Sequence, residues 1–240
     1  AIDNIGLGRV MIKALRYWSD AMGLTHEEKE QGGIRLIPEP IYHSILNHDL
    51  YFQRLGSLLL LHRNLALNEE NATAWYWLFN EWKQNVFTKD AFVDGFHSFL
   101  SVNGMKVKKT AVDKEFNCLK NTYIGEGKFD KNSIMDEDTY PFLAPLQILK
   151  ETGKNTYEKR SLTGKEVPLE ILIYSIAMDN IDESSSGRQI NIDKLMEEKR
   201  QIGKYFGIKY SKLLELLVEA ENKKYIKVEI YGTVNVKNVK

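Results

Sequence analysis

The sequence predicts a mainly α-helical protein. It is expected to have a helix-turn-helix or winged-helix-like N-terminal part, a helical middle, and a C-terminal winged-helix-like module with a small β-hairpin. Three observations predict this fold class: an amphipathic segment opens the chain, apolar residues recur at helical spacing through the middle, and two strand-like runs follow helical segments near the C-terminus. We expect three parts, residues 1–37, 38–150 and 166–240, with a polar, turn-rich boundary before the last.

The first predicted helix follows Gly8 and stops at Gly23. At about 100° per residue, four apolar side chains share one face: Met11, Leu15, Trp18 and Met22. The opposite face carries three cations: Arg9, Lys13 and Arg16. Such a helix is typical of the second helix of a helix-turn-helix, which packs on its own domain and contacts DNA phosphates and base edges. The alternative is a surface helix with a solvated basic stripe.

The next segment, residues 32–38, is interpreted as one strand of a wing, which adds Arg35 to the candidate DNA contacts. A helix-turn-helix needs a helix before its turn, and only four residues precede Ile5. We therefore expect the natural protein to begin upstream of Ala1.

Composition restricts the classes of function. The 240 residues include 33 basic and 33 acidic side chains, and this zero net charge argues against nonspecific coating of nucleic acid. A local basic patch remains compatible with it. One cysteine excludes an intrachain disulfide framework and suits a reducing compartment. No apolar run approaches the roughly 20 residues that span a bilayer, and no secretory leader is evident, so a cytoplasmic protein without membrane contact is expected.

The middle of the chain reads as a series of buried helices. Asp49 is predicted to cap a long central helix over residues 50–67. Trp75, Phe79 and Trp82 follow at i, i+4, i+7 spacing and predict a core face. Base stacking is the alternative for these aromatic rings, but it usually needs interleaved Lys and Arg.

Two further helices are predicted from capping signals. Thr88 precedes a helix that runs to about Leu100, and Thr110 begins a capping-box pattern that leads to Tyr123. Residues 125–141 then form a polar loop with an acidic trio, Asp136 to Asp138.

The C-terminal module is predicted to contain three helices, over residues 168–178, 192–198 and 209–221, before strands at 225–230 and 233–236. Helices followed by a hairpin match the order of a winged helix. The third helix mixes Glu and Lys and suits a protein partner better than a phosphate backbone. The hairpin region is more basic and supplies three candidate DNA contacts: Lys223, Lys224 and Lys227.

Catalytic signatures are absent from the residue patterns. The run around Lys154 lacks the leading Gly and the Ser or Thr of a phosphate loop, and His43 and His48 have the wrong spacing for metal ligands on one helical face. Asp136, Glu137 and Asp138 resemble a magnesium site, but such acidic loops are usually solvated. We therefore predict no catalytic residue, no metal ligand and no cofactor.

Four motifs occur in the same order in one known family: Leu7 to Trp18, Thr73 to Glu81, Pro145 to Leu149, and Val167 to Tyr174. On these residues the chain resembles the bacterial DUF4007 family, a domain of unknown function. The resemblance implies a place in gene clusters for DNA modification and phage defence, often near phosphoadenosine-phosphosulfate-reductase-like proteins of DNA phosphorothioation systems. It implies no catalytic residues.

Three functions are therefore weighed. The first is a non-enzymatic DNA-binding or adaptor subunit of such a bacterial system, with double-stranded DNA and other proteins of the complex as partners. The second is a protein-binding scaffold without DNA contact. The third is a metal-dependent DNA-acting enzyme that uses the acidic trio at residues 136–138.

Overall fold

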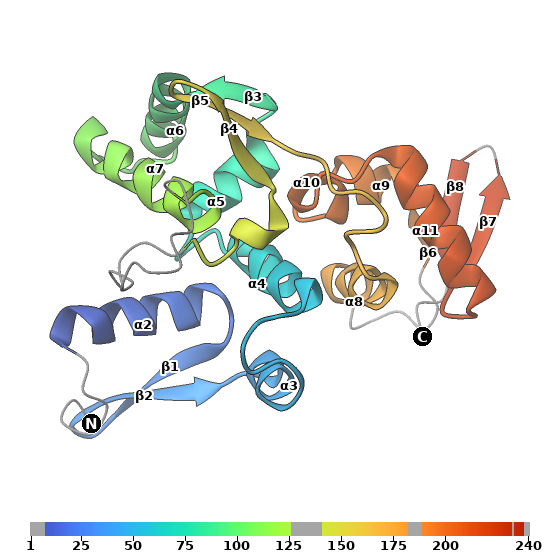
Figure 1. Ribbon diagram of the computed structural model, residues 1–240, viewed down its shortest axis with the longest axis horizontal. Helices are drawn as coiled ribbons and strands as arrows, with labels where there is room; N and C mark the ends of the chain where they lie inside the picture. The colour runs from blue at the N-terminus through green and yellow to red at the C-terminus, as the bar shows by residue number, and fades with distance from the viewer. Residues whose placement is uncertain (1–7, 126–140, 182–188, 232, 238–240) are drawn as a thin grey trace, which may run out of the picture.

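The computed structural model describes residues 8–125, 141–181, 189–231 and 233–237. The protein is mainly helical with small antiparallel sheets, as predicted. Figure 1 shows helix α4 (Leu55–Leu67) near the centre, between two groups of elements that lie along the long axis. The acidic trio and residues 182–188 lie outside the described residues. Within the described ranges, no helix is both long and apolar enough to cross a membrane.

The N-terminal group pairs one helix with a hairpin. Helix α2 (Arg9–Ala21) leads through Gly23, whose φ is +67°, into β1 (Thr25–Glu30) and β2 (Gly33–Pro38). The strands pair antiparallel, and α3 (Pro40–His48) follows. The sequence predicts β2 but not β1, because His-Glu-Glu-Lys-Glu lacks the alternation of apolar and polar residues that marks a half-buried strand.

The aromatic segment of the middle region changes its helical type. Helix α5 (Thr73–Tyr76) continues directly into η1 (Trp77–Glu81), a single π-helical turn. Helices α6 (Lys89–Val102) and α7 (Lys109–Tyr123) pack beside it. Trp75 and Phe79 are buried as predicted, and Trp82 is half-buried. π-helical turns are rare and frequently occur at functional sites.

Capping predictions have mixed outcomes. Thr88 caps α6 as predicted, since its hydroxyl accepts the Ala91 N–H at 3.2 Å. The prediction for Asp49 is wrong, because α4 begins at Leu55 and the Asp49 carboxylate accepts the N–H groups of Gln53 and Arg54 in the preceding turn. The prediction for Thr110 is also wrong, because α7 already begins at Lys109.

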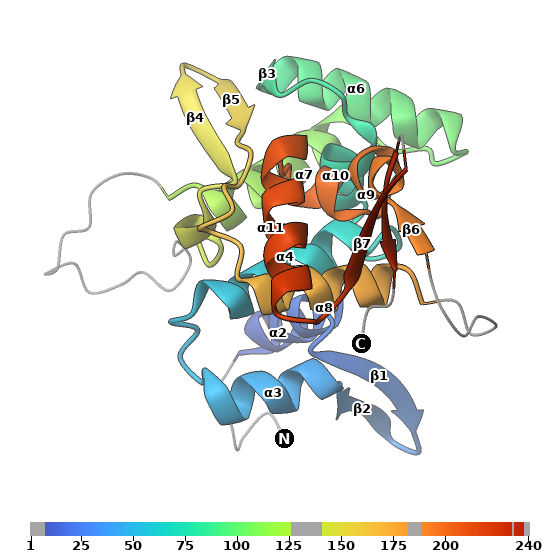
Figure 2. The same cartoon turned by 90° about the vertical axis from the view of Figure 1, so that its right-hand side faces the viewer.

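Two three-stranded antiparallel sheets complete the fold. The first sheet has the strand order β3-β5-β4. A 3₁₀ turn, η2 (Ala144–Leu146), comes before β4 in the chain. Its strands are β3 (Val86–Thr88), β4 (Leu149–Gly153) and β5 (Thr156–Lys159). The second has the order β6-β8-β7 and packs with the C-terminal helices (Figure 2). The C-terminal elements are α8 (Leu169–Asp179), β6 (Gln189–Asn191), α9 (Ile192–Glu197), α10 (Ile202–Tyr205), α11 (Tyr210–Asn222), β7 (Lys227–Tyr231) and β8 (Thr233–Lys237).

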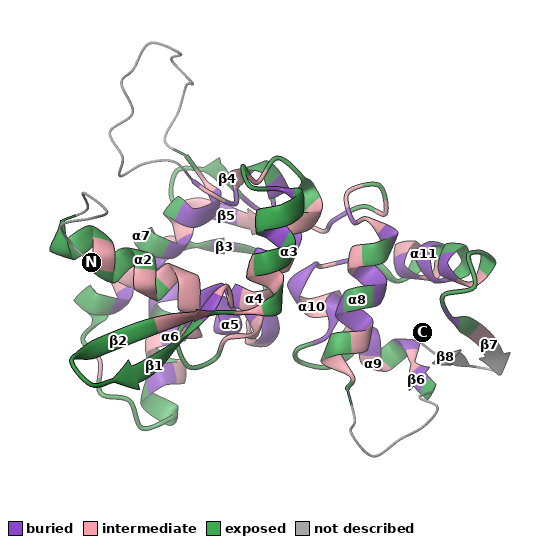
Figure 3. Ribbon diagram, turned by 90° about the horizontal axis from the view of Figure 1, so that it is seen from below, coloured by how far each residue is buried: buried purple, intermediate pink, exposed green. Residues whose placement is uncertain are grey.

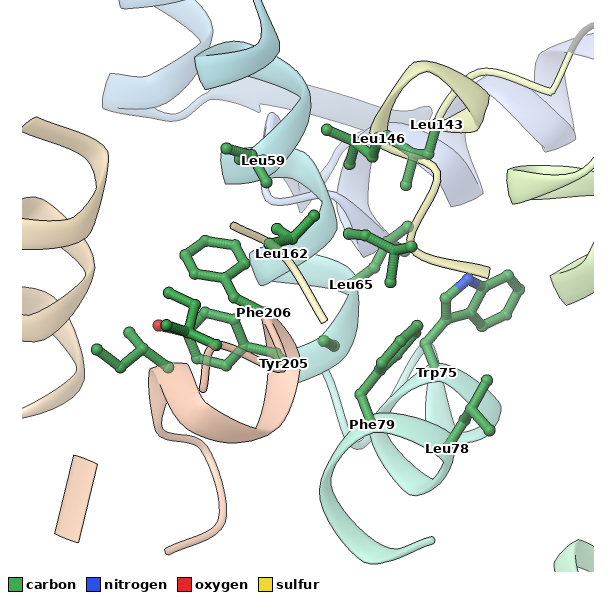
Figure 4. Close-up of a cluster of buried hydrophobic side chains, with 14 of the residues drawn as sticks. Leu59, Leu65, Trp75, Leu78, Phe79, Leu143, Leu146, Leu162, Tyr205 and Phe206 are labelled. Carbon is green, nitrogen blue, oxygen red and sulfur yellow. The ribbon is translucent and has the colours of Figure 1, made fainter. Parts of the chain in front are cut away.

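One connected hydrophobic core runs from Ala21 to Ile226. Figure 4 shows its middle, where leucines of α4 meet Trp75 and Phe79 from one side and Tyr205 and Phe206 from the other. Because α4 contacts α5, η1, η2, α8 and α10, it joins the middle region to the C-terminal elements through buried apolar contacts.

His62 and Arg63, neighbours on α4, add polar links inside this core. The fully buried His62 ring donates from Nε2 to the Tyr205 carbonyl at 2.7 Å, and its Nδ1 accepts the Tyr123 hydroxyl at 2.7 Å. A carbonyl only accepts, so Nε2 carries a proton, and in the neutral ring Nδ1 is then the acceptor. Burial lowers the pKa of His62 to about 4.

Arg63 reaches in a different direction from the same helix. Its guanidinium pairs with the Asp179 carboxylate on α8, which also accepts the Tyr205 hydroxyl. Only 2% of the Asp179 side chain is exposed. Burial raises the pKa of the Asp179 carboxyl, although Arg63 and Tyr205 oppose this shift. Tyr205 therefore serves both neighbours on α4, through its carbonyl and its hydroxyl.

The lowered pKa of His62 predicts that the stability of the folded protein decreases in acid. The folded-state pKa of about 4 lies below the ordinary value of 6.5, so the unfolded chain binds a proton that the folded chain excludes between these values. The free energy of unfolding is expected to fall by about 3 kcal/mol from this group as the pH drops from 6.5 to 4. Urea unfolding of the wild type and of His62→Gln between pH 6.5 and 4 measures this decrease in the free energy of unfolding.

The exposed His43 supplies the matched control, since His43→Gln is expected to retain the wild-type pH dependence. A pH titration of the wild type followed by histidine NMR spectra measures the pKa of His62 directly, without a variant. A His62 ring that becomes cationic near pH 6.5 in the folded protein contradicts the assignment.

Candidate nucleic-acid interface

The N-terminal end of α2 carries two exposed cations, Arg9 in the first turn and Lys13 at the start of the second, and has no side-chain cap among the described residues. Gly8 occupies the N-cap without a side-chain cap, and the first turn contains no acidic residue. Its leading N–H groups and the helix dipole therefore contribute partial positive charge. Arg9 and Lys13 are exposed, and neither makes an ion pair within the described part of the chain. This end of α2 can attract an anion such as a phosphate.

Arg16 and Arg35 have carboxylate partners, unlike these two cations. The Arg16 guanidinium donates two hydrogen bonds, at 2.7 and 2.8 Å, to the Glu27 carboxylate on β1. These bonds hold the pKa of the Glu27 carboxyl below its ordinary value. Arg35 donates to Glu30 at 3.2 Å across the hairpin. Arg16 therefore connects α2 to its own hairpin.

The hairpin itself carries more acidic than basic side chains. Glu27, Glu28 and Glu30 lie exposed on β1, and Glu28 and Glu39 flank His26 at 3.5 and 2.6 Å. The hydrogen bond with Glu39 raises the pKa of His26, with a smaller contribution from Glu28. An acidic strand repels phosphates, so cationic character in this group is concentrated at the start of α2.

The apolar face of α2 is anchored at one end only. Trp18 meets the Trp75 ring edge-on at 5.6 Å, and Met22 is buried, as predicted. The expected inward packing of Met11 and Leu15 is wrong, because their exposed fractions are 41% and 47%. Within the described structure, the part of α2 that precedes Trp18 is therefore mostly exposed. Figure 3 shows the exposed residues on its N-terminal half and on the hairpin.

The C-terminal lysines form a separate patch. Lys223 pairs with Glu219 at 3.0 Å and Lys227 with Glu229 at 3.2 Å. Lys224 is exposed, has a φ of 62°, and makes no ion pair within the described residues. Figures 1 and 3 place α2 and β7 at opposite ends of the long axis. The fold therefore brings Arg9 and Lys13 together but keeps them apart from these lysines.

Sequence reasoning missed a second cationic region, a cavity of about 590 Å³ beside the π-helical turn. It collects side chains such as Lys159 and Lys204 from segments that are distant in the sequence. Helical or strand spacing in the sequence gives no signal for such a cluster. In the structure, the π-helical turn lies beside it. In the described ranges, no group of three His, Cys, Asp or Glu side chains is arranged to hold a metal ion.

Comparison with known families identifies the chain. The family described as protein of unknown function (DUF4007) matches residues 1–240, the whole sequence. The chain belongs to the DUF4007 family. The resemblance seen in the four sequence motifs is thereby confirmed. None of the curated proteins compared with this DUF4007 chain matches it.

Two solved structures resemble this DUF4007 protein in fold. One is described as a magnesium ion-bound SspB crystal structure, with a TM-score of 0.83, and the other as an SspB crystal structure, with a TM-score of 0.84. Each is 21% identical to this chain, and each alignment covers 100% of this chain and 74% of the other. At this identity the likeness establishes a shared fold.

Proposed function

We propose that this DUF4007 protein is a DNA-binding adaptor subunit of a bacterial DNA-modification or phage-defence system and acts in the cytoplasm. The observation that supports DNA contact best is the N-terminal end of α2, where, among the described residues, the N–H groups have no side-chain cap and the nearby cations Arg9 and Lys13 have no ion-pair partner. Together they offer hydrogen-bond donors and positive charge to a phosphate backbone. The family's expected association with DNA phosphorothioation supplies the biological setting.

The C-terminal elements support an adaptor role. Helix α8, strand β6, helices α9 to α11 and the β7–β8 hairpin follow one another in the order of a winged helix, with β8 between β6 and β7. The helix before the wing, α11, pairs Lys212 with Glu215 and exposes Tyr210 and Val218. Such a mixed surface suits a protein partner better than DNA. We assign this module to protein contact within the complex.

Neutralising the start of α2 tests the DNA contact. The variant Arg9→Gln/Lys13→Gln is expected to bind a duplex more weakly, and the slope of log affinity against log salt is expected to decrease by roughly two, about one per lost phosphate contact. Fluorescence anisotropy with a labelled duplex over a salt series measures both quantities, for phosphorothioated and unmodified DNA.

Two single variants are controls for this test. Arg16→Gln is expected to leave the slope almost unchanged, because Glu27 already holds that guanidinium. Lys150→Gln removes an exposed lysine of β4, away from α2. Wild-type affinity and slope in Arg9→Gln/Lys13→Gln would refute the assignment of these residues to DNA contact.

A scaffold without DNA contact is the second candidate, and the exposed apolar face of α2 favours it. Val10 is 81% exposed beside Met11 and Leu15. The variant Met11→Ser/Leu15→Ser is expected to lose capture of a purified protein encoded by a neighbouring gene, while its helical content is unchanged. Capture by the wild type with no measurable duplex affinity favours the scaffold. Duplex binding without any such capture argues against it.

A metal-dependent DNA-acting enzyme is the third candidate, because one structure of similar fold is described as magnesium ion-bound. The described residues of this chain do not fit a magnesium site, since they contain no suitable acidic cluster. Under this hypothesis, duplex cleavage requires magnesium and disappears when Asp136, Glu137 and Asp138 are changed together to Asn, Gln and Asn. Gel analysis of modified and unmodified plasmid measures it, and intact DNA throughout dismisses the enzyme.

A further inference from the structure

The cavity beside the π-helical turn joins three parts of the fold. Its walls come from the end of η1, the end of β5 and the segment around α9 and α10, and its volume is about 590 Å³. Five cationic side chains line it: Lys83, Lys159, Arg160, Lys199 and Lys204. Volumes of about 300 to 1,000 Å³ are typical of small-molecule sites.

Lys159 is the cavity lysine whose ammonium group is held deepest in the protein. Its ammonium donates to the carbonyls of Leu78 at 3.0 Å and Trp82 at 2.5 Å, at the C-terminal end of the π-helical turn. An ammonium has three N–H donors, so these two bonds leave one donor for another acceptor. Burial, with a smaller contribution from the Lys204 ammonium, lowers the pKa of Lys159 to about 8.

The carboxylates of the cavity leave much of this positive charge uncompensated. Glu81 is held by Lys199 at 2.5 Å, and Glu197, whose side chain is 77% exposed, reaches Lys204 only at 3.6 Å. Lys83 and Lys159 have no carboxylate within ion-pair distance in the described part of the chain.

Arg160 is already occupied by structural contacts. Its guanidinium makes two bonds to Glu166, at 3.0 and 2.7 Å, and further bonds to the carbonyls of Leu146 and Gln147. The hydrogen bond with Arg160 lowers the pKa of Glu166 to about 2. Because Lys199 is likewise paired with Glu81, the cations left for a ligand are Lys83, Lys159 and Lys204.

We propose that this cavity is a phosphate-binding site for a ligand of nucleotide size, with Lys83, Lys159 and Lys204 as its cations. An anion placed between Lys159 and Lys204 adds two attractions that offset the repulsion between these ammonium groups, in a partly desolvated site where such interactions are strong. The phosphate belongs either to a free nucleotide or to the 5′ end of a DNA strand, and both present the same group.

Calorimetry with the 240-residue chain tests the site. The probes are inorganic phosphate, ADP, and a short single strand with and without a 5′-phosphate. Lys204→Gln is expected to weaken binding of the phosphate-bearing probe roughly tenfold, in line with one lost charged hydrogen bond. Lys83→Gln is expected to weaken it as well. Lys150→Gln, outside the cavity, is expected to bind like the wild type.

Each possible result decides the matter. ADP binding without preference for the 5′-phosphorylated strand identifies a free nucleotide, whereas that preference identifies a strand end. Absence of saturable binding by every probe overturns the proposal, and so does an equal loss in Lys204→Gln and Lys150→Gln. Thermal unfolding of each variant checks that Lys204→Gln remains folded, and Lys83→Gln offers a second, exposed position. None of these variants changes Arg9 or Lys13, so the result is independent of duplex binding by α2.

Discussion

The paired anchoring of His62 and Arg63 on α4 is the constraint on which the arrangement of the protein depends. One residue reaches α7 and α10, and its neighbour reaches α8, so a single helical turn of α4 is linked to residues that lie 61, 143 and 116 positions away in the sequence. Removal of one partner from a buried ion pair typically costs about 3–5 kcal/mol, because the other charge stays buried without compensation. Arg63 and Asp179 therefore specify how the C-terminal group docks, in addition to the apolar core.

Asn80 makes a second connection of this kind. Its amide group donates to the carbonyls of Ala66 and Tyr76, and its oxygen accepts the backbone N–H of Arg200 at 2.7 Å. A buried amide whose hydrogen bonds are satisfied favours one arrangement, because any other leaves polar groups unpaired. The π-helical turn that contains Asn80 is thus linked both to α4 and to the segment between α9 and α10, and this fixes the walls of the cavity.

Sequence patterns predicted the elements that local chemistry determines. The helix over residues 9–21, the Thr88 cap and the C-terminal hairpin follow from periodicity, capping and turn residues. Strand β1 was missed because backbone pairing with β2 forms it without an apolar face. The predicted face of α2 was right at Trp18 and wrong at Met11, since periodicity states which residues share a side and tertiary structure decides how much of that side is covered. The cavity lysines were missed because their proximity depends on long-range packing.

The two exposed cationic patches lie at opposite ends of the long axis, and one continuous core separates them. Under the proposed function, duplex DNA at α2 and a protein at the C-terminal module therefore occupy well-separated surfaces and do not compete for space. The distance between the two surfaces is set by the buried links through α4, so it is a property of the protein's own interior.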